Sequence, residues 1–169
     1  MSETVPAPEV VLNMPARAEG VGVVRQALAG MADALAFDQG VLSDMKMAVT
    51  EACTNVVVHA YDDAGELEVE MTADELGLTI LVRDQGTGIR PHPARSETPA
   101  LGLGLPLIAA LSDAFELRGG VGEGTEVRMT FHYARDAAAV AGRAVPGQVG
   151  ADGRWDPEAG SRQPSAGGS

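Results

Sequence analysis

The chain has 169 residues, of which 45% are apolar and 21% charged, and its formal net charge is −12. This length and apolar content predict one globular domain with a core, and they exclude a wholly disordered chain. No apolar stretch approaches the roughly 18 residues of a membrane span, and the first residues lack the pattern of a secretion signal. With Cys53 as the single cysteine, no intrachain disulfide can form, and we expect a cytoplasmic protein without membrane contact.

The negative charge is confined to residues 1–133, which hold 8 basic and 20 acidic side chains. Such a surface opposes the broad basic footprint with which proteins bind nucleic acid, so we expect no direct nucleic-acid partner. A partner protein with a basic patch would suit it, although an acidic surface also serves solubility alone.

The first half of the chain predicts a strand and two helices. Residues 9–14 form a short strand that is closed by Pro15. Residues 16–37 predict a helix whose apolar side chains recur at helical spacing, namely Val23, Ala27, Leu28, Met31 and Leu35. Residues 41–61 predict a second helix with one apolar stripe, made of Leu42, Met45, Val49, Cys53, Val56 and Ala60.

Strands dominate the second half. Residues 66–73 alternate apolar and acidic side chains, which predicts a strand with one wet face, and residues 76–83 predict a more buried strand. Residues 102–112 predict a helix, and residues 114–118 and 125–133 a hairpin. Because helices and strands cluster instead of alternating, we expect an α+β fold, a two-layer sandwich whose mostly antiparallel, mixed sheet carries helices on one face.

The composition changes near both ends of this domain. We expect residues 1–7 to be a flexible N-terminus and residues 8–133 to be the folded domain. Residues 134–169 hold seven of the 21 glycines and three prolines, with few bulky apolar side chains. Such a segment cannot offset the entropy of ordering, so we predict a disordered tail.

Glu51 and Asn55 lie four residues apart on the predicted second helix, so their side chains leave the same face. A carboxylate and an amide held on one rigid helix can act on a single bound ion or molecule. An ordinary solvated helix face would show the same spacing.

Asp84 ends the predicted buried strand, where a carboxylate needs a hydrogen-bond partner. An ionised aspartate only accepts hydrogen bonds, which suits the exocyclic amine of adenine. Gly86 and Gly88, which precede Ile89, let the backbone pass close to a flat ring. A common Asp-x-Gly turn is the alternative interpretation.

Gly102 and Gly104 immediately precede an apolar helix, and backbone N–H groups at a helix start bind phosphate. A dinucleotide fingerprint is disfavoured because Leu107 occupies the third glycine position. A P-loop is excluded because Lys46 is the only lysine and no Gly-Lys-Ser/Thr occurs.

Thr125 follows Gly124 at the start of the last predicted strand, where its hydroxyl could reach an adenine edge beside Asp84. Together the motifs offer a carboxylate base, an oxygen ligand for a hard cation, an acceptor for a purine amine and N–H groups for phosphate. This set indicates an ATP site.

In their order, the motifs resemble the GHKL ATPase superfamily over about residues 8–133. Within it, the chain looks most like the anti-sigma-factor serine kinases of the sporulation and general-stress type. Residues 51–61 (Glu-Ala-Cys-Thr-Asn-Val-Val-Val-His-Ala-Tyr) and 102–108 (Gly-Leu-Gly-Leu-Pro-Leu-Ile) carry this likeness.

The resemblance implies roles for individual residues. Asn55 would hold Mg²⁺, Glu51 would deprotonate the attacking hydroxyl, and Asp84 would contact adenine. Residues 90–100 would form the ATP lid, with Arg95 as a contact to the γ-phosphate. The remaining implied ATP contacts are Gly86, Gly88, Ile89, Leu101, Gly102, Leu103, Gly104, Leu105 and Thr125.

The resemblance also implies the protein's activity and partners. The expected protein is an ATP-dependent serine/threonine kinase and anti-sigma factor that sequesters a sigma factor and phosphorylates a STAS-type anti-anti-sigma protein. Arg25 is the expected partner contact, and a homodimer is expected through the first strand and helix. The alternative is a nucleotide-binding module that sequesters a partner without useful phosphoryl transfer. A sensor histidine kinase fragment is disfavoured because no histidine precedes His59.

Overall fold

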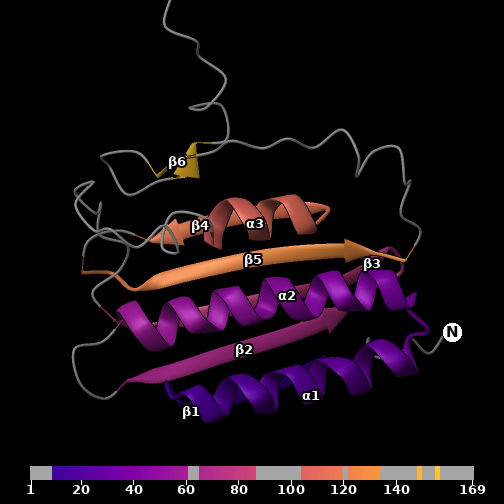
Figure 1. Ribbon diagram of the computed structural model, residues 1–169, viewed down its shortest axis with the longest axis horizontal. Coiled ribbons are helices and arrows are strands. Elements are labelled where there is room, and N and C mark those ends of the chain that lie inside the picture. The colour runs from indigo at the N-terminus through magenta and orange to yellow at the C-terminus, as the bar shows by residue number, and fades with distance from the viewer. Residues whose placement is uncertain are drawn as a thin grey trace, which may run out of the picture.

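The computed structural model describes residues 9–60, 65–86, 104–119, 122–133, 148–149 and 155–156. Its elements in chain order are β1 (Glu9–Pro15), α1 (Ala18–Ala34), α2 (Gln39–Asn55), the π-helix η1 (Val56–Ala60), β2 (Glu66–Ala73), β3 (Gly77–Asp84), α3 (Gly104–Leu111), β4 (Ala114–Gly119), β5 (Thr125–His132), β6 (Gln148–Val149) and β7 (Trp155–Asp156). The helices α1, α2 and α3 cover one face of the sheet (Figure 1). The predicted α+β sandwich is confirmed.

The main sheet has the strand order β1-β2-β3-β5-β4, and each neighbouring pair is antiparallel. β5 therefore lies between β3 and β4, although β4 precedes it in the chain. This order places the end of β3 opposite the start of β5, so that Asp84 and Thr125 face each other in register.

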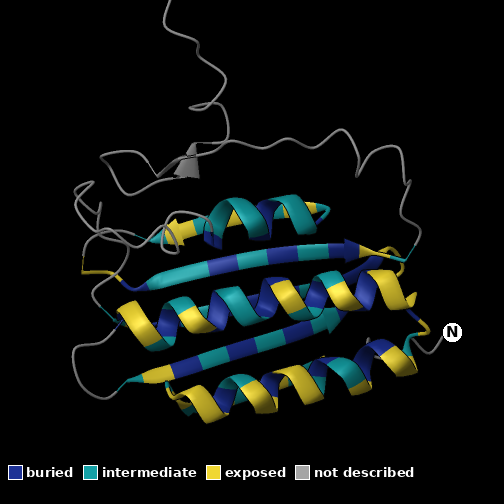
Figure 2. Ribbon diagram, in the orientation of Figure 1, coloured by how far each residue is buried: buried dark blue, intermediate teal, exposed yellow. Residues whose placement is uncertain are grey.

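The core lies between the sheet and the helices, where the inward sides of α1, α2, β2, β3 and β5 are buried (Figure 2). The predicted apolar stripe of α2 and η1 is confirmed, because all six of its residues are buried. The predicted alternation in β2 is confirmed as well, since Leu67, Val69 and Met71 are fully buried.

The predicted inner face of α1 is wrong at one position. Val23 is 53% exposed, whereas the adjacent Val24 is completely buried. Val24 shares its face with Leu28 and Met31, at the four- and three-residue spacing of a helix that packs on a sheet. Two adjacent valines gave the sequence no means of distinguishing which one points inward.

The end of the second predicted helix also differs from the prediction. The α-helix ends at Asn55, and a π-helical turn follows from Val56 to Ala60. A π turn accommodates an extra residue in a helix and is often found at functional sites. It keeps both Val56 and Ala60 buried.

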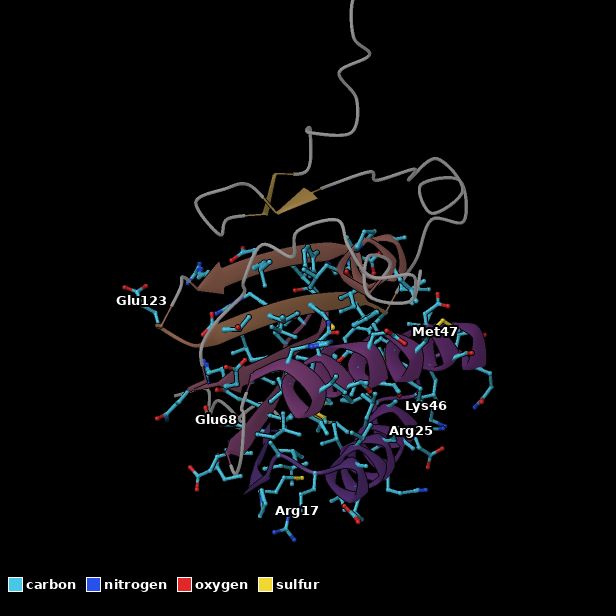
Figure 3. The ribbon with its side chains drawn as sticks, turned by 60° about the vertical axis from the view of Figure 1, so that its left-hand side comes forward. Arg17, Arg25, Lys46, Met47, Glu68 and Glu123 are labelled. Carbon is cyan, nitrogen blue, oxygen red and sulfur yellow. The ribbon has the colours of Figure 1, made fainter. Side chains whose placement is uncertain are left out.

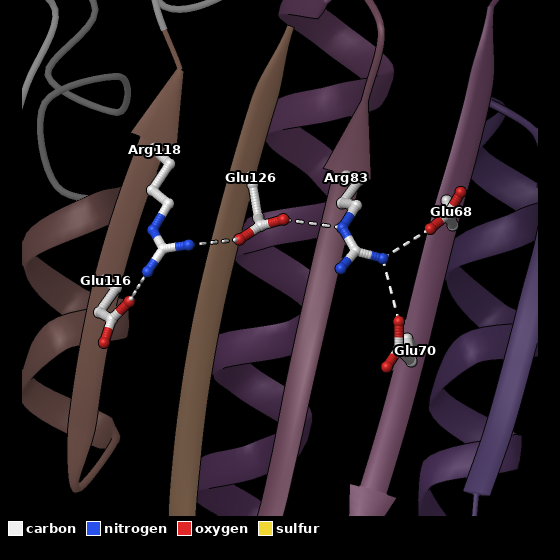
Figure 4. Close-up of polar contacts among 6 residues, drawn as sticks. All are labelled: Glu68, Glu70, Arg83, Glu116, Arg118 and Glu126. Carbon is white, nitrogen blue, oxygen red and sulfur yellow. Dashed lines mark hydrogen bonds and ion pairs between the residues drawn. The ribbon is translucent and has the colours of Figure 1, made fainter.

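Charged side chains cover the sheet face that lies away from the helices. Figure 3 shows Glu68 on the opposite side of the molecule from Lys46 of α2. Arg83 Nη1 lies 2.7 Å from Glu68 Oε1 and 3.0 Å from Glu70 Oε2, and its Nε lies 2.8 Å from Glu126 Oε2 (Figure 4). These hydrogen bonds, first of all the one that Arg83 donates to Glu126, raise the pKa of Arg83. Cross-strand pairs of this kind support the register of β2, β3 and β5.

Little of the predicted tail can be compared with the structure. β6 and β7 pair antiparallel, a short ladder that the sequence does not predict. The predicted N-terminus, residues 1–7, lies outside the described residues. So does the predicted tail, residues 134–169, apart from Gln148–Val149 and Trp155–Asp156. The predictions for these two segments stay predictions. Across the described ranges, no helix combines the length and apolar character that crossing a membrane requires.

We predict that Cys53 does not react with iodoacetamide in the native protein. Its side chain is fully buried in the core, and this burial raises the pKa of the thiol to about 12. Only the thiolate is nucleophilic, so neither access nor charge permits alkylation near neutral pH. Mass spectrometry should detect alkylation only when urea unfolds the protein. Rapid labelling without denaturant would contradict this placement of α2.

Candidate ATP site

Glu51 and Asn55 meet the start of α3. Gly104, the first residue of α3, is buried, and a Cβ built on it would lie 3.3 Å from Asn55 Nδ2 and 3.5 Å from Glu51 Oε2. Both polar side chains are half-buried on the last two turns of α2. The structure therefore brings a carboxylate and an amide to a helix N-terminus, where backbone N–H groups favour anions.

Asp84 lies at the opposite wall of the same region, at the end of β3. Its side chain is only 8% exposed, and the N–H of Gly86 donates to its Oδ1 at 2.9 Å. Burial raises the pKa of the Asp84 carboxyl, an effect that hydrogen bonds from Gly86 and Thr125 partly offset. A buried carboxylate with this deficit favours a ligand that brings a further hydrogen-bond donor.

Two glycines allow the backbone around Asp84 to pack closely. A Cβ on Gly86 would collide with the carbonyl of Ala60, and a Cβ on Gly124 would collide with the carbonyl of Asp84. Gly124 also has a φ of +75°, which side-chain-bearing residues rarely adopt. The sequence analysis explained Gly86 by the close approach of a flat ligand ring to the backbone. The structure shows instead that Gly86 packs against the backbone carbonyl of Ala60.

A small cavity of about 60 Å³ joins these parts of the site. Asn55, Asp84 and Thr125 are the polar groups at its wall that the sequence predicted. Leu105 of α3 lines it too, as expected from the phosphate motif. Glu51 lies outside this lining, one helical turn before Asn55.

Several lining residues were missed by the sequence analysis. His59 was interpreted only as a helix-end residue, yet it lines the cavity. The apolar part of the wall is formed by Ala52, Val56, Ala60, Val82 and Val127. A helical spacing of three or four residues from Asn55 could have identified Ala52 and His59.

The other predicted site residues are placed as follows. Arg25 is exposed on α1 and does not line the cavity. Gly88, Ile89, Arg95, Leu101, Gly102 and Leu103, with the whole predicted lid (residues 90–100), lie outside the described residues. Their predicted contacts with ATP stay predictions.

The architecture is that of a GHKL-type ATPase domain. Residues 14–131 match the family described as the histidine kinase-like ATPase domain, and the chain belongs to this family. The predicted membership of the GHKL superfamily is confirmed.

The chain is also similar to serine-protein kinases within this class. It is 35% identical over 141 residues to the serine-protein kinase RsbW of Bacillus cereus (strain AH820), covering 76% of this chain and 87% of the relative. The RsbW of Bacillus mycoides (strain KBAB4) is 34% identical with the same coverage. The predicted likeness to serine kinases of this superfamily is confirmed.

A solved structure shows the same fold. The RsbU and RsbW domains of Rv1364c from Mycobacterium tuberculosis superpose with a TM-score of 0.59 at 22% sequence identity. The match covers 79% of this chain and 34% of the longer Rv1364c chain.

We predict that Gly124→Ala destabilises the protein more than Gly122→Ala. Both glycines have positive φ, but only Gly124 approaches another backbone, whereas nothing lies within 4 Å of the Cβ position at Gly122. Gly122→Ala should lower the free energy of unfolding by about 1 kcal/mol from strain alone, and Gly124→Ala by about 3 kcal/mol. Urea denaturation measures both, and equal losses would contradict the close approach to Asp84.

We predict that Asp84→Asn removes a pH-dependent component of stability. In the folded protein the pKa of Asp84 is raised above its ordinary value of 3.8, so the native state binds this proton more tightly than the unfolded state. The contribution of Asp84 to the free energy of unfolding therefore falls as pH rises from 3.8, the ordinary pKa, to the higher pKa of the folded protein. Above the folded-state pKa this contribution is constant. Asparagine does not ionise and lacks this loss.

Calorimetry of both proteins across the acidic range tests the assignment. The melting temperature of Asp84→Asn relative to wild type should increase as pH rises towards neutral. A relative decrease would show that Asp84 is stabilised as a carboxylate in the ligand-free protein.

Proposed function

We propose that this protein is an ATP-dependent serine/threonine kinase and anti-sigma factor that acts in the cytoplasm. It sequesters a sigma factor and phosphorylates a serine of a STAS-type anti-anti-sigma protein. The observation that carries the proposal is the meeting of Glu51 and Asn55 with Gly104 at the start of α3, beside the cavity at Asp84. The similarity to the serine-protein kinase RsbW supports the choice of kinase over other GHKL activities.

Asp84 and Thr125 would recognise the adenine base. The carboxylate is buried at the cavity wall and accepts hydrogen bonds, as the exocyclic amine of adenine requires. The apolar side chains that line the rest of the cavity suit the faces of a flat ring. The raised pKa of Asp84 is consistent with a wall that lacks one donor until a ligand supplies it.

Asn55 is the residue that would hold Mg²⁺. Its amide group lies beside Gly104, where the missing Cβ leaves room for phosphate oxygens next to the backbone of α3. A neutral amide oxygen suits this hard cation, which takes most of its other ligands from phosphates and water. When bound, Mg²⁺ would neutralise charge on the phosphates during transfer.

Glu51 would accept the proton of the attacking serine hydroxyl. Its carboxylate lies one turn before Asn55 and is half-exposed, so it can face the phosphates and a protein substrate together. A general base in this position orients the hydroxyl and removes its proton as the phosphorus–oxygen bond forms.

A homodimer through β1 and α1 is part of the proposal. β1 is an edge strand of the described sheet, and its core-facing residues Val10, Leu12 and Met14 are only half-buried. The equivalent residues of β2 are fully buried. A second copy packed along this edge would complete the burial of β1.

A nucleotide-binding module without phosphoryl transfer is the second candidate. Its support is that, among the described residues at the cavity wall, none is lysine or arginine to stabilise a transferring phosphate. Arg95 is proposed to supply this charge from the predicted lid. Phosphoryl transfer itself separates the two candidates.

We predict that Glu51→Ala abolishes phosphorylation of a STAS-type anti-anti-sigma protein from the same organism but leaves ATP binding nearly intact. Loss of a general base should lower the rate by about 10²- to 10⁴-fold. Asn55→Ala should instead weaken binding of Mg-ATP, because it removes the proposed protein ligand of the ion. Radiolabelled ATP measures transfer, and calorimetry measures binding.

Two outcomes would contradict these assignments. Transfer that is unaffected by Glu51→Ala would remove the base, and unchanged Mg-ATP affinity in Asn55→Ala would remove the metal ligand. Tight ATP binding by the wild type without any transfer would favour the binding module.

A further inference from the structure

Lys46 and Met47 form an exposed crest on α2, and Met47 lies directly beside Glu51. An α-helix turns by about 100° per residue, so Glu51 is displaced by only about 40° from Met47, and Lys46 by about 100° in the opposite direction. Met47 is 46% exposed, and the side chains of Lys46 and Glu51 are half-exposed on its two sides. A cation, an apolar side chain and the proposed base therefore follow one another across the solvent face of α2.

Two cations, Arg25 of α1 and Lys46 of α2, lie on neighbouring helices. α1 and α2 pack against each other, and Arg25 and Lys46 lie near the middle of their helices. In the view of Figure 3, the labels of Lys46, Arg25 and Met47 lie on the same side of the molecule. The crest is thus positive at its α1 side, in a domain whose net charge is strongly negative.

These two cations are not neutralised by the described part of the protein. Arg83 and Arg118 are paired with glutamates on the sheet, but no such pair is formed by Arg25 or Lys46 within the described ranges. The helix positions three and four residues away from them hold no acidic residue, being Val21, Gly22, Leu28 and Ala29 for Arg25 and Leu42, Ser43, Val49 and Thr50 for Lys46. Their charge is available to a partner.

The position of Glu51 determines what approaches this surface. The nucleotide site lies on the side of Glu51 that faces α3. A protein hydroxyl that reaches Glu51 from solvent passes close to Met47, which lies one turn earlier on the same helix. A methionine is well suited to such a contact because its flexible thioether adapts to the surface of a partner.

We propose that Lys46 and Met47 dock the protein substrate and select an acidic surface that carries an apolar side chain beside its target serine. This inference rests on the proposed kinase function and assigns the substrate chemistry of that site. Lys46 attracts the acidic surface, with Arg25 adding to the local charge. Met47 packs against the apolar side chain and so positions the serine hydroxyl at Glu51. Both are positioning residues, since neither contacts the nucleotide.

Charge reversal at Lys46 and truncation at Met47 test the proposal, with the STAS-type protein of the kinase assay as the probe. Lys46→Glu should raise the KM for this protein about tenfold at low salt, and the effect should shrink as ionic strength rises. Met47→Ser should raise the KM several-fold without this salt dependence. The kcat and the affinity for ATP should stay near the wild-type values, and Lys46→Arg should restore the KM.

Two matched controls lie away from α2, one at the N-cap of α1 and one within α1. Arg17→Glu reverses an exposed charge at the start of the helix, and Val23→Ser truncates an exposed apolar side chain. Both should leave the KM for the STAS-type protein near that of the wild type. Because α1 also belongs to the proposed dimer edge, size-exclusion chromatography must show that each control keeps the oligomeric state of the wild type. An equal effect of Arg17→Glu and Lys46→Glu would reduce the result to net charge and overturn the site.

The remaining outcomes separate this proposal from the kinase function. If the wild type transfers phosphate and Lys46→Glu and Met47→Ser have an unchanged or lower KM, the docking site is wrong and the kinase stands. If the wild type transfers no phosphate, calorimetry with the same STAS-type protein and a non-hydrolysable ATP analogue replaces the KM. Unchanged affinity of Lys46→Glu in that measurement overturns the docking site, and absence of any binding overturns both.

Discussion

Two backbone contacts that leave no room for a methyl group hold the site together. Gly86 packs against the carbonyl of Ala60 at the end of the helix layer, and Gly124 packs against the carbonyl of Asp84. The end of β3 is thereby held between η1 and the start of β5. This position buries Asp84 while donors from both neighbours still reach it, and the cavity opens beside it.

The two carboxylates of the site differ because their surroundings differ. Asp84 is buried at the end of a strand, and its raised pKa records a desolvation cost that its hydrogen bonds do not fully offset. Glu51 is on a helix surface and keeps contact with solvent. A buried acceptor suits recognition of a bound base, and a half-exposed carboxylate suits exchange of a proton with an incoming hydroxyl. Under the proposed function, burial would thus separate binding from catalysis within one small region.

Much of this arrangement could be predicted from the sequence, because the relevant signals are local. The four-residue spacing of Glu51 and Asn55, the strand end at Asp84 and the glycine at the start of α3 each follow from the geometry of a single element. The choice between Val23 and Val24 could not be made, since it depends on how α1 rests on the sheet. The packing reason for Gly86 and the cavity position of His59 depend on contacts between elements distant in the chain. No periodicity in one segment reports such contacts.

The π turn after Asn55 gives the length of this segment a meaning of its own. Five residues, Val56 to Ala60, span a turn that an α-helix completes with fewer, and Ala60 ends it against Gly86. Deleting a single valine would let the helix close regularly, but Ala60 and His59 would then rotate away from the cavity. The protein should therefore tolerate exchange among apolar residues in this turn more readily than deletion of a residue. The packing of Ala60 against Gly86 thus depends on the number of residues in this turn.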